Sequence, residues 1–320
     1  ITIPSEERRI SMYPMDFEEF LYAGGIGREV VDAMRRNFSK QQSLSPAMHT
    51  KMLNLFKKYM LVGGLPKAVD NYLCNKNIVA FRAVQHEVHT LYGFDASKYE
   101  SEHGRKLKIR RIFDMIPSRL ENRKKRLIVK DIEDKYWKRY DDYVDEFDYL
   151  LAAGIALEVK AISKPSYPLV ENCGKNLLKL YLNDVGILSG ILYQNNSQAI
   201  LSDLKSINLG SVYETVVAQE LKAHGYALYY YDNKKNGEVD FLIDDVDNLS
   251  NIPIEVKSGK DYTVHSALNK FLQLDEYNIR RAYVLSNEPQ VYTKNGITYL
   301  PIYYVMFFEN NVVPADAFLE

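Results

Sequence analysis

The chain has few of the features typical of secreted proteins, membrane proteins or proteins stabilised by a structural metal ion. Of its 320 residues only Cys74 and Cys173 are cysteines, and they lie far apart, outside any metal-ligand spacing. A chain of this length without a disulfide framework is expected in a reducing cytoplasm. No apolar run approaches the roughly 18 residues of a membrane-spanning helix, so we expect no membrane contact. The polar start shows no signal-peptide pattern and leads us to expect the middle of a longer protein.

The chain also lacks a dominant charge and a nucleotide-binding loop. Its 41 basic and 42 acidic residues leave a net charge of −1, so any attraction to nucleic acid must be local. The pattern Gly-x-x-x-x-Gly-Lys-Ser/Thr occurs nowhere. Gly174-Lys175 and Gly259-Lys260 lack both the earlier glycine and the hydroxyl residue. We therefore expect that these residues alone cannot build a P-loop.

What is present begins with a helical region. Apolar periodicity predicts helices over residues 14–22, 47–60 and 67–74, interrupted at 63–66 by Gly-Gly-Leu-Pro. No catalytic constellation is visible in this part of the chain. The length of 320 residues favours two or three domains.

A strongly basic stretch follows, with fourteen Lys or Arg against five acids over residues 105–139. Helices predicted at 112–117, 128–133 and 140–153, followed by a strand at 155–162, suggest a winged helix. Its basic groups favour contact with a DNA backbone. The alternative is a winged helix used for protein contacts or as a rigid spacer, with its basic face in solvent. Five acids on the third predicted helix argue against a place deep in the major groove.

From about residue 201 the sequence pattern predicts a mixture of helices and strands. We predict a small mixed sheet flanked by helices. Before it, residues 177–192 have the pattern of a buried helical pair. The expected elements are a helix at 211–223, strands at 226–231, 238–243 and 252–256, a helix at 264–274, a strand at 281–285 and a closing segment at 302–308.

Four residues in this last part form a candidate site. Glu214 lies on the apolar stripe of the predicted helix 211–223, whereas Glu220 and Lys222 are expected in solvent. Asp240 lies in one predicted strand, and Glu255 and Lys257 share a face of the next. Pairing of these strands would bring Asp240, Glu255 and Lys257 together.

An acid, a second acid and a Glu-x-Lys suit metal-dependent cleavage of phosphodiesters. Asp240 and Glu255 would supply hard oxygen ligands to Mg²⁺ or Mn²⁺, with the Val256 carbonyl as a further ligand. Lys257 would orient or deprotonate the attacking water, and Glu214 would hold a second metal ion or its water. The alternative is a set of unrelated charges, with Glu255 and Lys257 on an exposed strand face.

The segments around these residues resemble a known family. Residues 213–221, 237–241 and 253–259 are similar to the C-terminal domain of unknown function DUF4143, which resembles PD-(D/E)XK nucleases. Further similar pieces are residues 116–118, 149–154, 163–165 and 179–186 and, upstream, residues 13–20 and 63–66, which resemble the end and lid of an AAA-type ATPase domain.

The resemblance implies the later part of an AAA/STAND-like ATPase, with ATP bound only in an upstream domain. It implies a multidomain α plus α/β fold: a helical ATPase lid region at 1–103, a winged helix at 104–200 and a nuclease-like sheet domain at 201–320. Glu214, Asp240, Glu255 and Lys257 match the nuclease motif. The expected function is metal-dependent hydrolysis of DNA. The alternative is a non-catalytic module that binds DNA or a protein partner under control of the ATPase.

Overall fold

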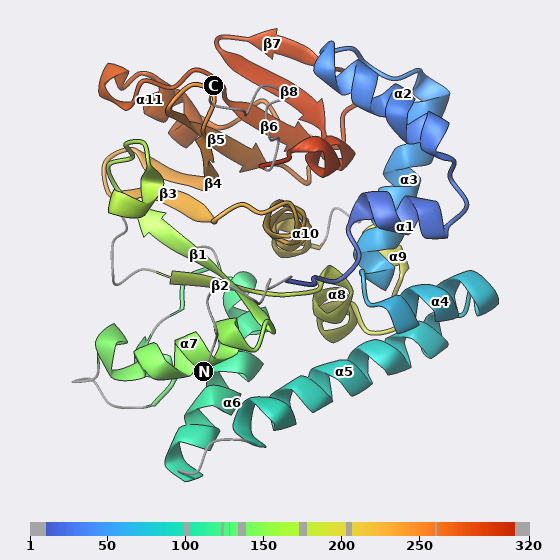
Figure 1. Ribbon diagram of the computed structural model, residues 1–320, viewed down its shortest axis with the longest axis vertical. Coiled ribbons are helices and arrows are strands. Elements are labelled where there is room, and N and C mark those ends of the chain that lie inside the picture. Colours follow the sequence, from blue (N-terminus) through green and yellow to red (C-terminus); the bar gives the residue numbers. More distant parts are fainter. Residues whose placement is uncertain are drawn as a thin grey trace, which may run out of the picture.

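The centre of the molecule is a mixed sheet. The computed structural model describes residues 11–98, 103–122, 125–127, 129–133, 139–172, 178–202, 207–259 and 261–310. Within them, eight strands form one sheet in the order β2-β1-β3-β4-β5-β6-β8-β7 (Figure 1). The strands are β1 (Ala156–Ile162), β2 (Leu178–Leu182), β3 (Tyr229–Asn233), β4 (Gly237–Asp245), β5 (Ser250–Val256), β6 (Tyr283–Ser286), β7 (Tyr292–Lys294) and β8 (Ile297–Pro301). A mixed α/β architecture is thereby confirmed.

The middle of the sheet follows from local sequence. β3, β4 and β5 form an antiparallel meander. Gly237 has φ +97°, a left-handed conformation that glycine adopts without strain, and it begins β4 just after the β3–β4 turn. Every residue of β5 is buried, as expected for an interior strand with both faces covered. The predicted strands at 238–243 and 252–256 are confirmed.

The predicted winged helix is not confirmed. Its first helix exists within α6 (His103–Leu120), but the second is only the 3-10 turn η1 (Val129–Asp131). The third is the turn η2 (Tyr140–Tyr143) followed by α7 (Val144–Ala152). The strand predicted as a wing is β1, which pairs antiparallel with β2 and parallel with β3. Alternation marks a strand but not its partner, and this one joins the main sheet across the predicted boundary at residue 200.

The N-terminal region is helical, as predicted. Its helices are α1 (Phe17–Ala23), α2 (Arg28–Ser39), α3 (Pro46–Val62), α4 (Pro66–Asn75) and α5 (Ile78–Lys98). Asp16 caps α1 in a capping box with Glu19, and Ser45 caps α3 with Pro46 in its first turn. No helix in the described part of the chain is long and apolar enough to cross a membrane.

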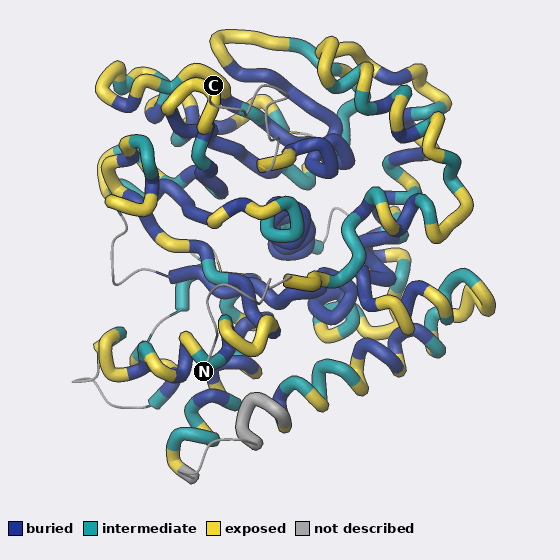
Figure 2. Tube along the Cα trace, in the orientation of Figure 1, coloured by how far each residue is buried: buried dark blue, intermediate teal, exposed yellow. Residues whose placement is uncertain are grey.

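One helix fills the middle of the molecule. The sheet curves around α10 (Gly210–Ala223), which Figure 1 shows end-on and Figure 2 shows buried. Residues 211–221 are all buried, and α10 contacts β1, β2, β5, α3, α8 (Val185–Tyr193) and the 3-10 segment η5 (Ile302–Phe307). The short helix α9 (Gln198–Leu201) packs on α3. The burial of α10 fixes where any side chain on it points.

The opposite face of the sheet holds a second apolar core. α11 (Ser266–Leu272) packs on β4, and its Leu268 and Phe271 are fully buried with Tyr231 and Val284. The 3-10 turns η3 (Leu169–Asn172) and η4 (Asp275–Tyr277) border this core. Two cores on two faces make the sheet a three-layer assembly.

The prediction for residues 177–192 was wrong. They are not a helical pair, because Leu178–Leu182 forms β2 although Leu and Lys favour helices, so the pairing with β1 overrides local propensity. The closing segment at 302–308, for which no element type was predicted, is mostly the 3-10 segment η5. The strands β7 and β8 at the edge of the sheet were not predicted.

Candidate functional site

The four predicted site residues come together where α10 faces the middle of the sheet. Glu214 lies in the first half of α10, and β4 and β5 carry Asp240 and Glu255. Asp240 Oδ2 accepts a hydrogen bond of 2.8 Å from the backbone N–H of Val256. The charges of Glu255 and Glu214 both raise the pKa of Asp240, so the three carboxylates share one electrostatic environment.

Glu214 is buried and fully satisfied within the fold. Its Oε2 accepts a hydrogen bond of 2.9 Å from the Tyr181 hydroxyl, and its Oε1 is ion-paired with Lys125. Burial works against the charged carboxylate, but Lys125 and Lys179 together hold its pKa below the ordinary value. Glu214 is therefore an anion with both oxygens occupied.

Asp240 and Glu255 differ from Glu214 in being poorly compensated. Burial raises the pKa of Asp240 well above its ordinary value, and the neighbouring Glu255 and Glu214 carboxylates raise it further. Burial also raises the pKa of Glu255, against the opposing effect of Lys257. Among the described residues, Glu255 Oε2 has no hydrogen-bond partner. Glu255 is buried and Asp240 is half-buried, so ionising both acids is costly unless a cation joins them.

Lys257 stands beside this pair as a fixed cation. Its Nζ lies 2.7 Å from Glu255 Oε1. Burial lowers the pKa of Lys257, but Glu255 and then Asp240 overcome this effect and leave the pKa above its ordinary value. The group is therefore an ammonium at neutral pH, which donates hydrogen bonds and does not accept a proton.

The structure adds residues that the sequence analysis missed. Lys179 on β2 is fully buried, with Nζ 2.5 Å from Glu238 Oε1 and 4.4 Å from the centre of the Tyr230 ring. Arg126 contacts Glu238 at 3.2 Å and Asp232 at 2.5 Å. One signal was available: Lys179 is the sole charged residue in the otherwise apolar run Leu-Lys-Leu-Tyr-Leu over 178–182. A buried lysine requires an anion, and the sequence does not say which.

The donor chemistry at this site fits a divalent cation. Mg²⁺ prefers carboxylate oxygens and usually keeps several waters, so one or two carboxylates suffice to bind it. Asp240 and Glu255 provide that pair, with the free Glu255 Oε2 as the available oxygen. In the residues that the structure describes, no group of three or more His, Cys, Asp or Glu lies close enough to hold a metal ion by itself. The arrangement therefore suits a hydrated ion rather than a closed protein cage.

A second polar cluster lies near the C-terminal end of α10. Glu220, which was expected in solvent, is fully buried. Its Oε1 accepts hydrogen bonds of 2.9 Å from the Phe17 N–H and from the Tyr59 hydroxyl, and burial raises its pKa to about 8. Glu220 lies off the apolar stripe of α10, which predicted an exposed position, but α10 is enclosed on all sides and residues 211–221 are all buried.

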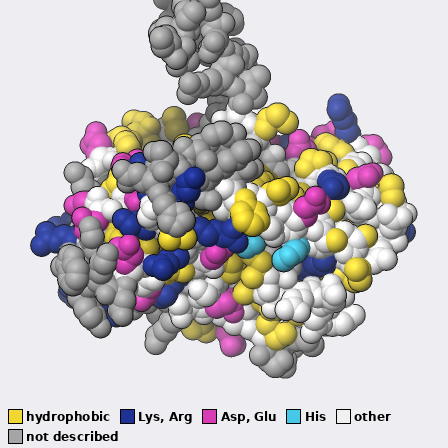
Figure 3. Space-filling view, turned by 90° about the horizontal axis from the view of Figure 1, so that it is seen from below, with side chains coloured by type: hydrophobic (Ala, Val, Ile, Leu, Met, Phe, Trp, Pro, Cys, Tyr) yellow, Lys and Arg dark blue, Asp and Glu magenta, His cyan; other side chains and the backbone are white. Residues whose placement is uncertain are grey.

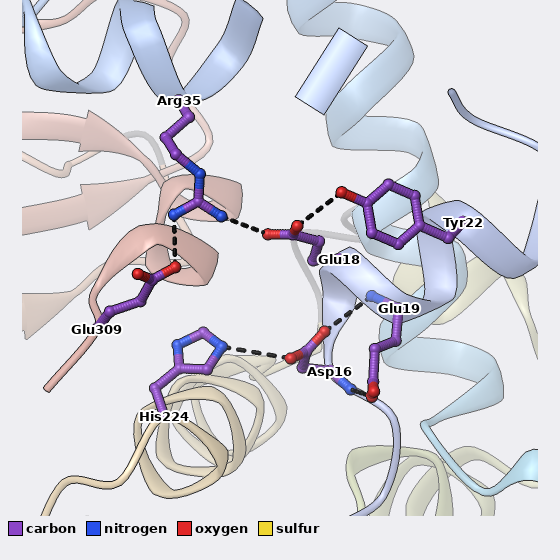
Figure 4. Close-up of a pocket in the computed structure, with 7 residues that line it drawn as sticks. All are labelled: Asp16, Glu18, Glu19, Tyr22, Arg35, His224 and Glu309. Carbon is purple, nitrogen blue, oxygen red and sulfur yellow. Dashed lines mark hydrogen bonds and ion pairs between the residues drawn. The ribbon is translucent and has the colours of Figure 1, made fainter. Parts of the chain in front are cut away.

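A pocket of about 340 Å³ lies beside this cluster (Figure 4). Arg35 bridges Glu18 at 2.8 Å and Glu309 at 2.5 Å, and His224 lies 3.4 Å from Asp16. Burial disfavours the imidazolium of His224, but the hydrogen bond to Asp16 and the charges of Glu220 and Asp16 raise its pKa to about 8. The lining residues are Asp16, Glu18, Glu19, Tyr22, Arg35, His224 and Glu309.

Several basic residues of the stretch 105–139 form ion pairs with acids where the structure describes them. Arg119 lies 2.7 Å from Asp131, and Arg110 lies 2.8 Å from Asp114. Figure 3 shows Lys and Arg side chains intermixed with Asp and Glu side chains on the face seen from below. Residues 123, 124, 128 and 134–138 of the stretch lie outside the described residues.

Comparison with known proteins matches two parts of the chain. Residues 209–305 match the family model described as a domain of unknown function, DUF4143. The chain carries a DUF4143 domain. Residues 53–198 match a second domain of unknown function, DUF8612. No curated protein and no solved structure matches the chain.

The DUF4143 domain holds all four predicted site residues, since Glu214, Asp240, Glu255 and Lys257 fall within 209–305. The resemblance to DUF4143 drawn from the sequence is thus confirmed for these residues. The ATPase and nuclease parts of that resemblance stay predictions.

Proposed function

We propose that this chain is a divalent-metal-dependent nuclease that cleaves DNA, with its active site in the DUF4143 domain. The observation that carries the proposal is the pair of acids formed by Glu255, which is buried, and Asp240, which is half-buried beside it. Lys257 neutralises only one of the two acids, and Glu255 Oε2 has no hydrogen-bond partner among the described residues, so ionising both acids is costly unless a further cation binds. Perturbed acids beside a lysine are typical of catalytic sites.

Each residue has a distinct role in this proposal. Asp240 and Glu255 hold the metal ion, which neutralises them and polarises the phosphodiester when bound. Lys257 stays protonated, because Glu255 and Asp240 stabilise its charge. It therefore stabilises the charge that builds on the phosphate oxygens and does not act as the base that deprotonates water. The backbone N–H of Val256 orients Asp240 at 2.8 Å.

The proposal extends to the whole protein. We propose that these residues are the later part of a cytoplasmic AAA-type ATPase, with ATP bound in an upstream domain and residues 1–103 ending that domain. The net charge of −1 gives no attraction to DNA over the whole surface, so the support for DNA as the substrate is the cluster of cations at the site, which a bound metal ion would leave in excess.

Cleavage of supercoiled plasmid tests the proposal. We expect nicking with Mg²⁺ or Mn²⁺ and none with EDTA. Asp240→Asn should remove activity together with Mn²⁺ binding by calorimetry, and Lys257→Met should lower activity about 100-fold while keeping Mn²⁺ bound. Asp247→Asn is the matched control, because its side chain is 88% exposed. Cleavage that survives both site variants would refute the assignment.

A second candidate is a non-catalytic module that binds DNA or a protein partner. The ion pairs of Glu214 with Lys125 and of Glu255 with Lys257 favour it, because they neutralise two of the three carboxylates without any metal. It predicts salt-sensitive DNA binding without cleavage and no Mn²⁺ binding. Calorimetry with Mn²⁺ separates the two candidates.

A further inference from the structure

A short segment from outside the DUF4143 domain reaches the carboxylate site. Residues 125–127, here called the strap, lie between α6 and η1. The Leu127 N–H donates to the Leu178 carbonyl at 3.0 Å, which fixes the strap beside β2. The Lys125 N–H donates to the Asn122 carbonyl at 3.1 Å and closes a turn. The strap belongs to the region that matches DUF8612.

Two consecutive basic residues of the strap form ion pairs with three acids of the sheet and α10. Arg126 contacts Asp232 at 2.5 Å and Glu238 at 3.2 Å, and Lys125 is ion-paired with Glu214. Lys125 has φ +49°, a conformation that non-glycine residues adopt rarely and that is found at functional sites. The anchor at Arg126 and the turn at Asn122 hold Lys125 in this conformation.

The side chain of Lys125 is held in position by its ion pair but keeps some exposure to solvent. Its exposed fraction is 13%, against 7% for Glu214 and none for Lys179. Each oxygen of Glu214 already has a partner, Lys125 at one and the Tyr181 hydroxyl at the other, and the Lys125 ammonium would compete with a metal ion for this carboxylate. Its contacts fit a residue that positions Lys125 better than they fit a metal ligand.

The charges of the site show what such a lysine could bind. Glu214, Asp232, Glu238, Asp240 and Glu255 lie near Lys125, Arg126, Lys179 and Lys257, so five acidic groups meet four basic ones. With all five acids ionised, a divalent ion on Asp240 and Glu255 would leave the site with an excess of one positive charge. An excess of this sign attracts phosphate groups.

We propose that Lys125 is a substrate-binding residue that contacts a DNA phosphate next to the cleavage position, and that Glu214 positions Lys125 instead of binding a second metal ion. The inference rests on the proposed nuclease function. It makes the active site composite, since the DUF4143 domain supplies the carboxylates and the strap supplies a phosphate contact.

Salt dependence of DNA binding tests this role. Each phosphate contact contributes about 0.9 to the slope of log K against log salt on duplex DNA. Binding of a labelled 20-base-pair duplex would be followed by fluorescence anisotropy with Mn²⁺, in full-length chains that carry Lys257→Met, which keeps Mn²⁺ bound and slows cleavage about 100-fold. We expect Lys125→Met to reduce the slope by about one and Lys125→Arg to keep it. Lys294→Met on β7, an exposed lysine at the far edge of the sheet, is the control.

Lys125→Met leaves the buried Glu214 carboxylate without its cation, which can destabilise the fold. A double variant in which both side chains are neutral is therefore measured beside it. Lys125→Met combined with Glu214→Gln should show the same reduced slope with a melting temperature closer to wild type. With Lys257 intact, we expect one Mn²⁺ per chain, unchanged in Glu214→Gln, and a DNA KM about tenfold higher in Lys125→Met.

The outcomes separate this inference from the proposed function. An unchanged salt slope in both Lys125 variants, with only the melting temperature lowered, would make the pair purely structural and overturn the inference. Two Mn²⁺ per chain, reduced to one by Glu214→Gln, would overturn it as well, and so would a wild type that binds no DNA. A wild type that binds DNA with the predicted slope change but never cleaves it refutes the nuclease function alone.

Discussion

Glu220 offers a direct test of the energetics at the core of the molecule. Its side chain is fully buried between α10, α1 and α3, and its Oε2 has no hydrogen-bond partner among the described residues. Burial raises its pKa from an ordinary value near 4.5 to about 8. The perturbation is Glu220→Gln, which removes the titration. The variant's amide oxygen can still accept from the Phe17 N–H and the Tyr59 hydroxyl.

The magnitude follows from proton linkage. In the unfolded chain Glu220 ionises above about pH 4.5, whereas in the folded chain it keeps its proton until about pH 8. The raised folded-state pKa therefore contributes stability that is complete below pH 4.5 and lost as pH rises to 8. Each pH unit in this window costs about 1.4 kcal/mol, which amounts to roughly 3 kcal/mol at pH 7. Glutamine at this position does not lose that stability.

The assay is urea unfolding of wild type and Glu220→Gln at pH 5, 6, 7 and 8. We expect a small difference at pH 5 that grows in favour of the variant by about 1.4 kcal/mol per pH unit up to pH 8. Glu276→Gln, at an exposed position on η4, is the control and should give a constant difference. A pH-independent difference for Glu220→Gln would refute the reasoning, because it would mean that Glu220 is ionised in the folded protein.

Three further predictions concern stability alone. Gly63→Ala should cost about 2 kcal/mol or more in urea unfolding, because Gly63 has φ +77° and a Cβ there would lie 2.3 Å from Asp184 Oδ1. Lys179→Met should cost about 3–5 kcal/mol, whereas Lys179→Met with Glu238→Gln should recover much of that loss, so a double-mutant cycle measures the pair. Phe271→Ala should cost about 3–5 kcal/mol, since its fully buried ring packs edge-on against Tyr231 at 4.7 Å, and a loss under 1 kcal/mol would contradict that packing.

Local patterns in the sequence predicted the elements that depend on nearby residues. The helices with clear caps, such as α3 after Ser45, and the strands β4 and β5 follow from periodicity and turns. The clustering of Asp240 with Glu255 was predictable for the same reason, because a single turn joins these two strands. The long-range partners were not, since β1 alternates equally well as a wing or as a sheet strand.

The acids of the site could be predicted from the sequence, but most of their cations could not. Carboxylates in apolar runs are conspicuous, and all four predicted residues lie together. The cations that neutralise them come from distant segments, Lys125 from the strap and Lys179 from β2. A sequence shows that a buried charge requires a partner but not which of 41 basic residues supplies it. Glu220 was misplaced because helical spacing reports one apolar face and does not reveal a helix enclosed by its surroundings.

The pairing of β1 with β3 has a practical consequence for anyone who expresses the DUF4143 domain alone. A chain limited to residues 209–305 would lose β1 and β2, and the backbone N–H and C=O groups of Lys160–Ile162 would no longer cover Tyr229–Tyr231. Three consecutive tyrosines would then line an open sheet edge, which is a template for pairing with other chains. Such a shortened protein should aggregate, so an inactive preparation of it would say nothing about the chemistry of the intact site.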